Sequence, residues 1–273
     1  MTRTILITGA SSGIGAAAAH LFYARGWNVV ATMRKPEAGA ELAQLERVLV
    51  TRLDLLDEDS IVAAVAAGTE RFGSIDVLLN NAGYGAYGIL EATPMDALRR
   101  QFEVNVFGLV AAIQAVLPQF RARKAGTIIN VSSVGGRTTY PLGSLYHGSK
   151  WAVEGLSEAL SFELSAIGVK VKLIEPGGVR TNFSGRSFEF THDPELKEYA
   201  PTVDKLMAAQ QAASQNPEHQ EPEEVAELIF EAATDDSDRL RYISGEGAKV
   251  LLAARREGDE EQFLAGLRQR FGF

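Results

Sequence analysis

The fold of this chain is decided near its beginning, where residues 4–15 read TILITGASSGIG. The apolar, β-branched run Thr4–Thr8 predicts a buried strand, and an alanine-rich helical pattern covers Ile14–Arg25. A glycine-rich turn joins the two. A strand, a glycine-rich turn and a helix in this order open the parallel βαβ units of doubly wound α/β proteins.

The turn places glycine at positions 9, 13 and 15. Glycine there permits a tight turn, close approach of the backbone to a pyrophosphate, and close packing of the helix on the strand. The helix N-terminus adds free amides and the positive end of its dipole, which attract an anion. A glycine triplet also occurs in ordinary turns, but the flanking strand and helix favour a loop that binds a dinucleotide. The residues expected to contact the cofactor here are Gly9, Ser11, Ser12, Gly13, Ile14 and Gly15.

Short apolar runs alternate with longer helical patterns along the chain, as in parallel βαβ units. The expected strands are Thr4–Thr8, Trp27–Met33, Val48–Leu53, Val77–Leu79, Thr127–Val131, Lys170–Ile174 and Tyr242–Ser244. The expected helices are Ile14–Arg25, Asp57–Phe72, Met95–Arg123, Leu145–Ile167 and Pro222–Ala233. This pattern predicts an α/β fold: a Rossmann-type doubly wound parallel sheet of about seven strands, with helices on both faces.

Residues 183–221 interrupt the alternation with a polar and aromatic stretch that has three prolines and one helical piece at about 195–213. A long interruption of this kind is usually a functional lid or an insertion. An α/β sheet of this length commonly forms one domain. We therefore expect a single domain over residues 1–273, with a substrate flap at about 183–221.

Composition and charge narrow the function classes. The net charge of −8 leaves no basic field for a phosphate backbone, so we expect no nucleic-acid partner. The chain has no cysteine, which excludes thiolate metal sites and cysteine nucleophiles, and its four histidines lack ligand spacing, so we expect no metal site. We see no run of the roughly 20 apolar residues that a membrane span needs. The start is too short an apolar run for a signal peptide, so we expect a cytoplasmic protein.

The end of the second expected strand, Met33-Arg34-Lys35, indicates which cofactor the loop binds. A cofactor with a free ribose 2′-hydroxyl usually meets an aspartate or glutamate about 20 residues after the glycine loop. Here two cations stand instead, and Arg34 can hold a 2′-phosphate through two parallel hydrogen bonds. The alternative is that both cations are solvated residues after a strand. The sequence favours NADP(H), with NADPH preferred over NADH.

Tyr146 and Lys150 stand one helical turn apart in the pattern Tyr-His-Gly-Ser-Lys. A free phenol has a pKa of about 10 and is a poor base at neutral pH, but a neighbouring ammonium stabilises the phenolate. We therefore expect Lys150 to lower the pKa of Tyr146 toward the working pH, where proton exchange with a carbonyl oxygen is effective. The pattern itself is common in helices, so the interpretation depends on the neighbouring motifs.

Three polar motifs are expected near Tyr146. Ser133 follows the strand Thr127–Val131, and residues 80–83 (Asn-Asn-Ala-Gly) follow the strand before it. The carboxyl ends of parallel strands are where open α/β sheets bind their ligands. Asn105 lies in an apolar helical setting, where it is either a functional group or a buried amide satisfied by the backbone.

With these motifs in place, the sequence resembles the short-chain dehydrogenase/reductase family, in its single-domain branch. The resemblance covers about residues 1–185, and the remainder more loosely. It implies hydride transfer between a nicotinamide cofactor and a carbonyl or alcohol. The motifs that carry it are Thr8–Gly15, Asp54-Leu55, Asn80–Gly83, Asn105, Ser133, Tyr146, Lys150 and Pro176-Gly177.

The resemblance implies four catalytic residues. Tyr146 exchanges a proton with the substrate oxygen, and Ser133 hydrogen-bonds the same oxygen. Lys150 holds the nicotinamide ribose, and Asn105 supports a proton relay through water. It also implies adenine contacts at Asp54, ribose contacts at Asn81 and carboxamide contacts at Thr181 and the turn before it. The further cofactor-binding residues are Arg34, Asp54, Leu55, Asn81, Ala82, Gly83, Tyr146, Lys150, Pro176, Gly177, Val179 and Thr181.

The expected partner is a small-molecule hydrophobic carbonyl or alcohol, because the positions around the reacting carbonyl are apolar or aromatic. Among such molecules we expect a bulky ketone, aldehyde or secondary alcohol of steroid, retinoid or aryl-ketone type, over a small sugar or an acyl phosphate. The apolar or aromatic positions are Tyr87, Val134, Tyr140, Leu142, Phe183, Phe188, Phe190 and Tyr199. The nearest cations in sequence, Arg137 and Arg186, are expected to face solvent. The end of the second strand is similar to that of NADP-preferring hydroxysteroid and retinol dehydrogenases. The resemblance also implies a homodimer or homotetramer built on the helices at 95–123 and 145–167.

Two other function classes compete with an active oxidoreductase. A catalytically silent NADP(H)-binding sensor can share the fold, but such proteins typically lose the tyrosine or the lysine, and both are present here. A nucleotide-sugar epimerase has related motifs, but usually a different glycine spacing and a longer C-terminal substrate region. We therefore expect an oxidoreductase, with turnover of ketones as the discriminating observation.

Overall fold

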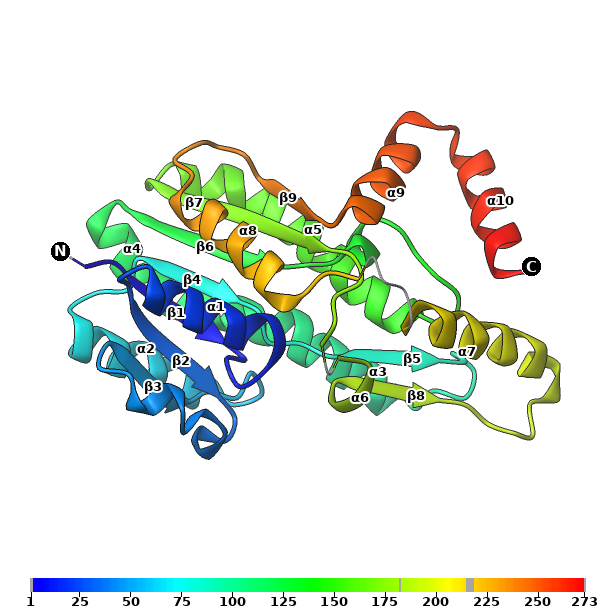
Figure 1. Cartoon of the computed structure of the whole chain (residues 1–273), viewed down its shortest axis with the longest axis horizontal. Helices are drawn as coiled ribbons and strands as arrows, with labels where there is room; N and C mark the ends of the chain where they lie inside the picture. Colours follow the sequence, from blue (N-terminus) through cyan, green and yellow to red (C-terminus); the bar gives the residue numbers. More distant parts are fainter. Residues whose placement is uncertain (1, 182, 215–218, 273) are drawn as a thin grey trace.

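Seven parallel strands form the central sheet, in the order β3-β2-β1-β4-β6-β7-β9 (Figure 1). The computed structural model describes residues 2–181, 183–214 and 219–272. The strands are β1 Thr4–Thr8, β2 Asn28–Met33, β3 Val48–Arg52, β4 Val77–Asn80, β6 Gly126–Val131, β7 Val169–Pro176 and β9 Arg241–Ser244. The predicted fold class and each of the predicted strands are confirmed, with small shifts at the strand ends.

Helices cover both faces of this sheet (Figure 1). One face carries α1 Gly13–Ala24 and α8 Pro222–Thr234, and the other carries α2 Glu58–Phe72, α4 Gly108–Arg123 and α5 Ser144–Ser165. Along β1, Ile5 and Ile7 join the first core, whereas Leu6 joins the second, because side chains alternate across a strand. A strand buried on both faces is a continuous apolar run, which made these strands predictable.

The strand order reverses between β1 and β4. The chain builds β2 and β3 outward on one side of β1, then returns to build β4, β6, β7 and β9 on the other. Ligands of doubly wound sheets bind outside the carboxyl ends of the strands at such a point. The glycine loop follows β1 and the Asn80–Gly83 motif follows β4, so both stand at this crevice.

A second sheet, which the sequence does not predict, joins the flap to residues 85–88. β5 Gly85–Gly88 pairs in parallel with β8 Phe188–Thr191, about 100 residues further along the chain. Gln101 fixes β5, because its Oε1 accepts a hydrogen bond from the Ala86 amide (2.6 Å) and its Nε2 donates to the Tyr84 carbonyl (3.0 Å). The other flap elements are α6 Phe183–Arg186, a 3-10 turn at Lys197–Tyr199 and α7 Ala200–Ser214.

The predicted helix at 95–123 is divided into α3 Met95–Phe102, a π-helical turn Glu103–Phe107 and α4. By length and composition alone, Met95–Arg123 could cross a bilayer, contrary to the sequence analysis, but 44% of its most apolar window is buried inside the protein. Several of its apolar residues, Ile113 and Phe120 among them, pack in the core. The absence of a membrane span stays a prediction.

Two C-terminal helices, α9 Glu246–Glu257 and α10 Glu260–Phe271, extend the fold beyond the predicted elements (Figure 1). Ala248 and Leu252 of α9 pack against Val134. Phe271 of α10 reaches Tyr140, with the ring centroids 5.7 Å apart. The C-terminus therefore lies close to the loop that precedes α5. The short 3-10 helices are Pro36–Gly39, Leu42–Gln44 and Val134–Gly136.

The helices expected between subunits leave large apolar side chains exposed. Phe107 at the start of α4 is 57% exposed, and Phe162 of α5 is 75% exposed. A homodimer or homotetramer stays a prediction.

Candidate active site

The glycine loop turns between β1 and α1 with Gly9 and Gly13 in the left-handed region, at φ +73° and +56°. A Cβ on Gly15 would overlap the carbonyl oxygen of Gly9 and lie 2.5 Å from Asn81 Nδ2. The side chain of Ser12 does not cap α1, and the first turn of α1 has no acidic residue. The helix N-terminus therefore keeps free amides and a positive dipole for an anion, which fits a pyrophosphate. The half-exposed loop residues are Ser11, Ser12, Gly13 and Ile14.

Two neighbouring segments lie against this loop. Asn81 Nδ2 donates hydrogen bonds to the carbonyls of Thr8 (3.0 Å) and Gly9 (3.2 Å). A Cβ on Gly13 would lie 3.3 Å from Thr181 Cγ2, so the segment after β7 covers the loop. The predicted residues of three separate segments thus meet here. Asn81 holds the loop in shape, a role that the sequence did not indicate.

The residues predicted for the adenine end follow β2 and β3. Arg34 is exposed and forms no ion pair within the described part of the chain. Asp54 is half-exposed, and its Oδ1 accepts a hydrogen bond from the Leu56 amide (3.1 Å). The Leu55 side chain is buried against Gly108 of α4, so its backbone is what remains for a ligand.

The remaining predicted cofactor residues lie at the ends of β4 and β7. The Ala82 amide donates to Thr8 Oγ1 (3.1 Å), and a Cβ on Gly83 would lie 3.2 Å from Asn105 Oδ1. Pro176 ends β7, and the Gly177 amide donates to the Ser244 carbonyl (3.1 Å). A bridge between Val179 and Gln220 follows.

Tyr146, Ser133, Lys150 and Asn105 gather beside this crevice. Tyr146 and Lys150 lie on α5, and both side chains are buried, at 8% exposure each. Tyr146 forms a side-chain hydrogen bond with Ser133, which also accepts one from the Gly135 amide (3.0 Å). Lys150 Nζ donates to the Val131 carbonyl (2.8 Å) and lies 5.9 Å from the Tyr146 ring centroid. The phenol, the hydroxyl and the ammonium that the sequence predicted are therefore together.

Aromatic side chains surround the Tyr146 ring. Tyr87 of β5 stacks on it, with the centroids 5.4 Å apart, and Phe183 of the flap meets it edge-on at 5.8 Å. Phe188 of β8 lies 5.1 Å from Tyr87. The flap therefore covers the phenol with apolar surface.

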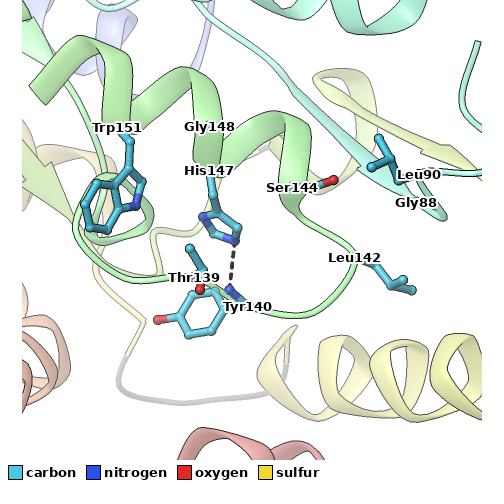
Figure 2. Close-up of a pocket in the computed structure, with 9 residues that line it drawn as sticks. All are labelled: Gly88, Leu90, Thr139, Tyr140, Leu142, Ser144, His147, Gly148 and Trp151. Atoms are coloured by element: carbon cyan, nitrogen blue, oxygen red, sulfur yellow. Dashed lines mark hydrogen bonds between the residues drawn. The ribbon is translucent and has the colours of Figure 1, made fainter. Parts of the chain in front are cut away.

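A cavity of about 560 Å³ lies between the start of α5, the loop before it and the end of β5 (Figure 2), and none of the four predicted catalytic residues lines it. Of the residues expected around the substrate, Tyr140 and Leu142 line it. Leu142 adopts the left-handed conformation (φ 58°), which is unusual for a residue with a side chain. The full lining is Gly88, Leu90, Thr139, Tyr140, Leu142, Ser144, His147, Gly148 and Trp151.

The family model described as short chain dehydrogenase matches residues 3–191. The chain belongs to the short-chain dehydrogenase/reductase family. An oxidoreductase of Schizosaccharomyces pombe is 43% identical over 88% of this chain and 100% of its own length. Estradiol 17-beta-dehydrogenase 1 of Rattus norvegicus is 36% identical over 89% of this chain and 74% of its own length.

Solved structures of short-chain dehydrogenases agree with this assignment. One from Streptomyces avermitilis superposes with a TM-score of 0.84 at 34% identity, covering 98% of this chain and 96% of the other. One from Burkholderia phymatum in complex with NAD has a TM-score of 0.80 at 28% identity, covering 96% and 95%. ElxO with NADP bound has a TM-score of 0.73 at 25% identity, covering 89% and 98%. The family is one of oxidoreductases that use a nicotinamide cofactor.

The pKa of the dehydrogenase tyrosine differs from the expectation. Burial raises the pKa of Tyr146 above its ordinary value, while the hydrogen bond with Ser133 lowers it and Tyr140 raises it. Lys150 lies over the face of the ring and gives a hydrogen bond to a backbone carbonyl, so burial dominates at the phenol. The expected net fall in the pKa of Tyr146 is therefore not what the structure shows, because burial outweighs any effect of Lys150 and the phenol is neutral at pH 7. The role of Tyr146 as general acid/base stays a prediction.

Asn105 lies in the π-helical turn, and such turns are frequent at functional sites. Its Oδ1 accepts a hydrogen bond from the Tyr84 amide (3.1 Å). Its Nδ2 donates to the Tyr84 carbonyl (2.8 Å) and to Ser149 Oγ (3.2 Å). The alternative of a satisfied buried amide therefore describes its contacts, and a proton relay through Asn105 stays a prediction.

His147, which follows Tyr146 on α5, is a positioning residue. It is buried, and its Nε2 accepts a hydrogen bond from the Tyr140 amide (3.1 Å; Figure 2). Its Nδ1 lies 2.9 Å from the Gly135 carbonyl. An Nε2 that accepts leaves the proton on Nδ1, which donates to Gly135. Burial lowers the pKa of His147, so the ring is neutral and ties the loop before α5 to the turn after Ser133. No spacing in the sequence signals this role.

Two residues near the substrate differ from their predicted places. Val134 packs with Ala248 and Leu252 in a small core, so it does not line the cavity. Arg137 does not simply face solvent, because its Nη1 lies 3.4 Å from Oε1 of the fully buried Glu175. The side chain of Arg186 lies outside the described part of the structure.

Proposed function

We propose that this protein is an NADP(H)-dependent oxidoreductase that acts on a hydrophobic ketone or aldehyde, or on a secondary alcohol, with Tyr146 as the general acid/base. The observation that carries the proposal is the buried Tyr146–Ser133 pair at the same sheet edge as the uncapped N-terminus of α1. The bound nicotinamide supplies or accepts the hydride.

The protein's own residues manage the proton and the charge. Tyr146 donates its phenolic proton to the carbonyl oxygen during reduction and takes it back during oxidation. Ser133 holds the same oxygen, and the Lys150 ammonium stabilises the negative charge that the proton transfer leaves on the phenol. Tyr87, Phe183 and Phe188 exclude water around the reacting atoms.

We expect wild-type protein to prefer NADPH over NADH by at least about tenfold in kcat/KM, about 1.4 kcal/mol. Arg34 is exposed at the end of β2 without an ion-pair partner in the described part of the chain, so its guanidinium is available to a 2′-phosphate. Arg34→Ala should remove most of this preference and leave the efficiency with NADH unchanged. Met33 is left intact in the test, because it is buried against Gly39 and a carboxylate there would disturb the fold.

Steady-state kinetics with both cofactors check this prediction. Arg99→Ala is the matched control, because Arg99 is an exposed arginine paired with Asp96 on α3. Equal efficiency with the two cofactors in the wild type would mean that Arg34 is an ordinary surface residue.

We also expect bulky apolar ketones to be reduced with at least about tenfold higher kcat/KM than matched ketones that carry a carboxylate or phosphate. Burial of apolar surface is favourable by about 25 cal/mol per Å², so 60 Å² of additional apolar contact gives about 1.5 kcal/mol. Arg137 is engaged by Glu175, so it is not free to bind an anion. Two relatives support this choice by their names, the rat estradiol dehydrogenase and a 3-ketodihydrosphingosine reductase of Bacteroides thetaiotaomicron.

The measurement is NADPH oxidation across paired steroid-like or aryl ketones and their anionic analogues. Phe183→Asp, which places a carboxylate beside the Tyr146 ring, should lower the efficiency with the apolar set. Higher kcat/KM for the anionic set in the wild type would overturn the substrate assignment and leave the oxidoreductase proposal intact.

A further inference from the structure

Four charged side chains meet behind the catalytic turn. Glu154 of α5 is 5% exposed, and Glu175 of β7 is fully buried. Arg241 of β9 contacts both through its Nε, at 3.0 Å from Glu154 Oε2 and 3.3 Å from Glu175 Oε1. Arg137 approaches Glu175 Oε1 at 3.4 Å. No residue of this cluster takes part in the mechanism derived above.

The pairing within the cluster is incomplete. Glu154 Oε1 and Glu175 Oε2 are buried and have no hydrogen-bond partner among the described residues. Arg241 is also shared with the exposed Glu158, whose Oε2 lies 2.6 Å from Arg241 Nη2. Buried carboxylate oxygens are normally paired, because an unpaired buried charge is costly. Arg241 therefore pairs with only one oxygen of the Glu154 carboxylate, and the other oxygen has no partner among the described residues.

Glu154 stands next to the catalytic lysine. It follows Lys150 by one helical turn, on the same face of α5. A Cβ on Gly136 would lie 2.6 Å from Ser132 Oγ, 2.9 Å from Glu154 Cγ and 3.1 Å from the Lys150 carbonyl. The Glu154 side chain thus packs against the turn that follows Ser133. The space at position 136 in this turn admits only a glycine.

The Lys150 ammonium is buried and needs a countercharge. Its recorded hydrogen bond is to the neutral Val131 carbonyl (2.8 Å). Gly83, which follows β4, lies near the ammonium and carries no charge, and Asn105 of the π-helical turn, next to Gly83, is neutral as well. Glu154 is the charged side chain that acts on Lys150. The charged groups that face Glu154 are Lys150 and Glu158 of α5, Glu175 of β7, Arg241 of β9 and Arg137 after the Val134–Gly136 turn.

We propose that Glu154 is a positioning residue that supplies the buried negative charge facing Lys150, and that Glu175, Arg137 and Arg241 hold Glu154 in that place. The consequence for catalysis rests on the proposed function, in which the Lys150 ammonium stabilises the phenolate. The effect of Glu154 on the charge of Lys150 does not rest on the proposed function.

The pKa shifts of Lys150 and Glu175, on either side of Glu154, agree with this geometry. Burial lowers the pKa of Lys150 to about 8, and the charge of Glu154 opposes that fall. Burial first, and then the charge of Glu154, raise the pKa of Glu175 to about 7, against the effect of Arg137 and Arg241. Only the protonated Lys150 can stabilise the phenolate. This stabilisation is therefore present below pH 8 and is lost as the pH rises through that value. Removing the negative charge of Glu154 lowers the pKa of Lys150 further, so this loss moves to lower pH.

The test follows the titration of Lys150 itself. Protein labelled with ¹³C at lysine Cε is titrated in the presence of saturating NADPH, and Lys150→Arg identifies its signal by absence. Glu154→Gln should lower the Lys150 midpoint by about one pH unit. Glu154→Asp keeps the negative charge, so its Lys150 midpoint should stay close to that of the wild type. Glu158→Gln is the matched control, because it removes another contact of Arg241 from an exposed position and should leave the midpoint within about 0.3 unit.

The alkaline limb of the pH profile of kcat/KM for ketone reduction should move by the same amount in Glu154→Gln and stay in place in Glu158→Gln. A purely structural role would lower activity equally at every pH. Glu154→Met, of similar volume, replaces the glutamine variant should that one fail to fold. Identical Lys150 midpoints in wild type and the neutral variants overturn the inference. A shifted midpoint in a protein that reduces no carbonyl supports the inference and rejects the proposed function instead.

Discussion

Tyr146→Phe is expected to lower kcat for carbonyl reduction by at least about 10³-fold, while NADPH affinity stays within a few fold. The substitution removes one oxygen atom and keeps the ring that stacks on Tyr87 and meets Phe183. The packing around the site is therefore retained. The variant loses the proton donor and the hydrogen bond to Ser133.

The raised pKa of Tyr146 sharpens this prediction. A neutral phenol is ready to donate a proton to a carbonyl oxygen, and no water is needed in its place. Phenylalanine has no proton to give, and the surrounding aromatic side chains limit rescue by solvent. Turnover is measured at the absorbance of reduced nicotinamide, and affinity by NADPH fluorescence. Tyr23→Phe on α1, far from the crevice, is the control for the loss of a phenol; wild-type kcat in Tyr146→Phe would end the proposed mechanism.

The residues that carry the sheet and the cofactor loop could be predicted, because their physics is local. A strand buried on both faces must be apolar along its length, and a left-handed turn favours glycine, as at Gly9 and Gly13. The i, i+4 spacing of Tyr146 and Lys150 fixes a shared helix face in the same way. These features need no knowledge of distant contacts.

The parts that escaped prediction depend on contacts between distant segments. β5 contains two glycines in four residues, and it forms because β8 and Gln101 supply its partners. The C-terminal α10 buries no residue, and its place depends on contacts such as that of Phe271 with Tyr140. The ion pairs of Arg137 and Arg241 with Glu175 join residues far apart in the chain.

The pKa values of Tyr146 and Lys150 could not be predicted from the sequence for the same reason. The spacing of Tyr146 and Lys150 predicts their proximity, but the direction of each shift depends on burial, which the flap and the neighbouring helices determine. The sequence thus predicts which residues lie together, but not the direction of their pKa shifts.

Gly15→Ala is expected to weaken NADPH binding at least about 100-fold, about 2.7 kcal/mol, and to lower the thermal midpoint. The new methyl group would overlap the Gly9 carbonyl, which is backbone and cannot rotate away as a side chain does. Gly9 is held at φ +73° and its carbonyl accepts a hydrogen bond from Asn81, so the loop can open only by breaking that contact. An opened loop no longer directs the amides of α1 at the pyrophosphate.

Gly155→Ala on α5 is the matched control, because a Cβ there meets nothing within 4 Å. Alanine in place of an exposed helical glycine should stabilise the protein by about 0.5–1 kcal/mol and leave NADPH affinity unchanged. Fluorescence titration with NADPH and thermal unfolding with and without the cofactor measure both effects. Wild-type affinity in Gly15→Ala would show that the loop relaxes without cost, and the pyrophosphate would then have to be held elsewhere. Because the stabilisation by a ligand grows with the logarithm of its concentration divided by Kd, Gly15→Ala should also be stabilised less by a given NADPH concentration than Gly155→Ala.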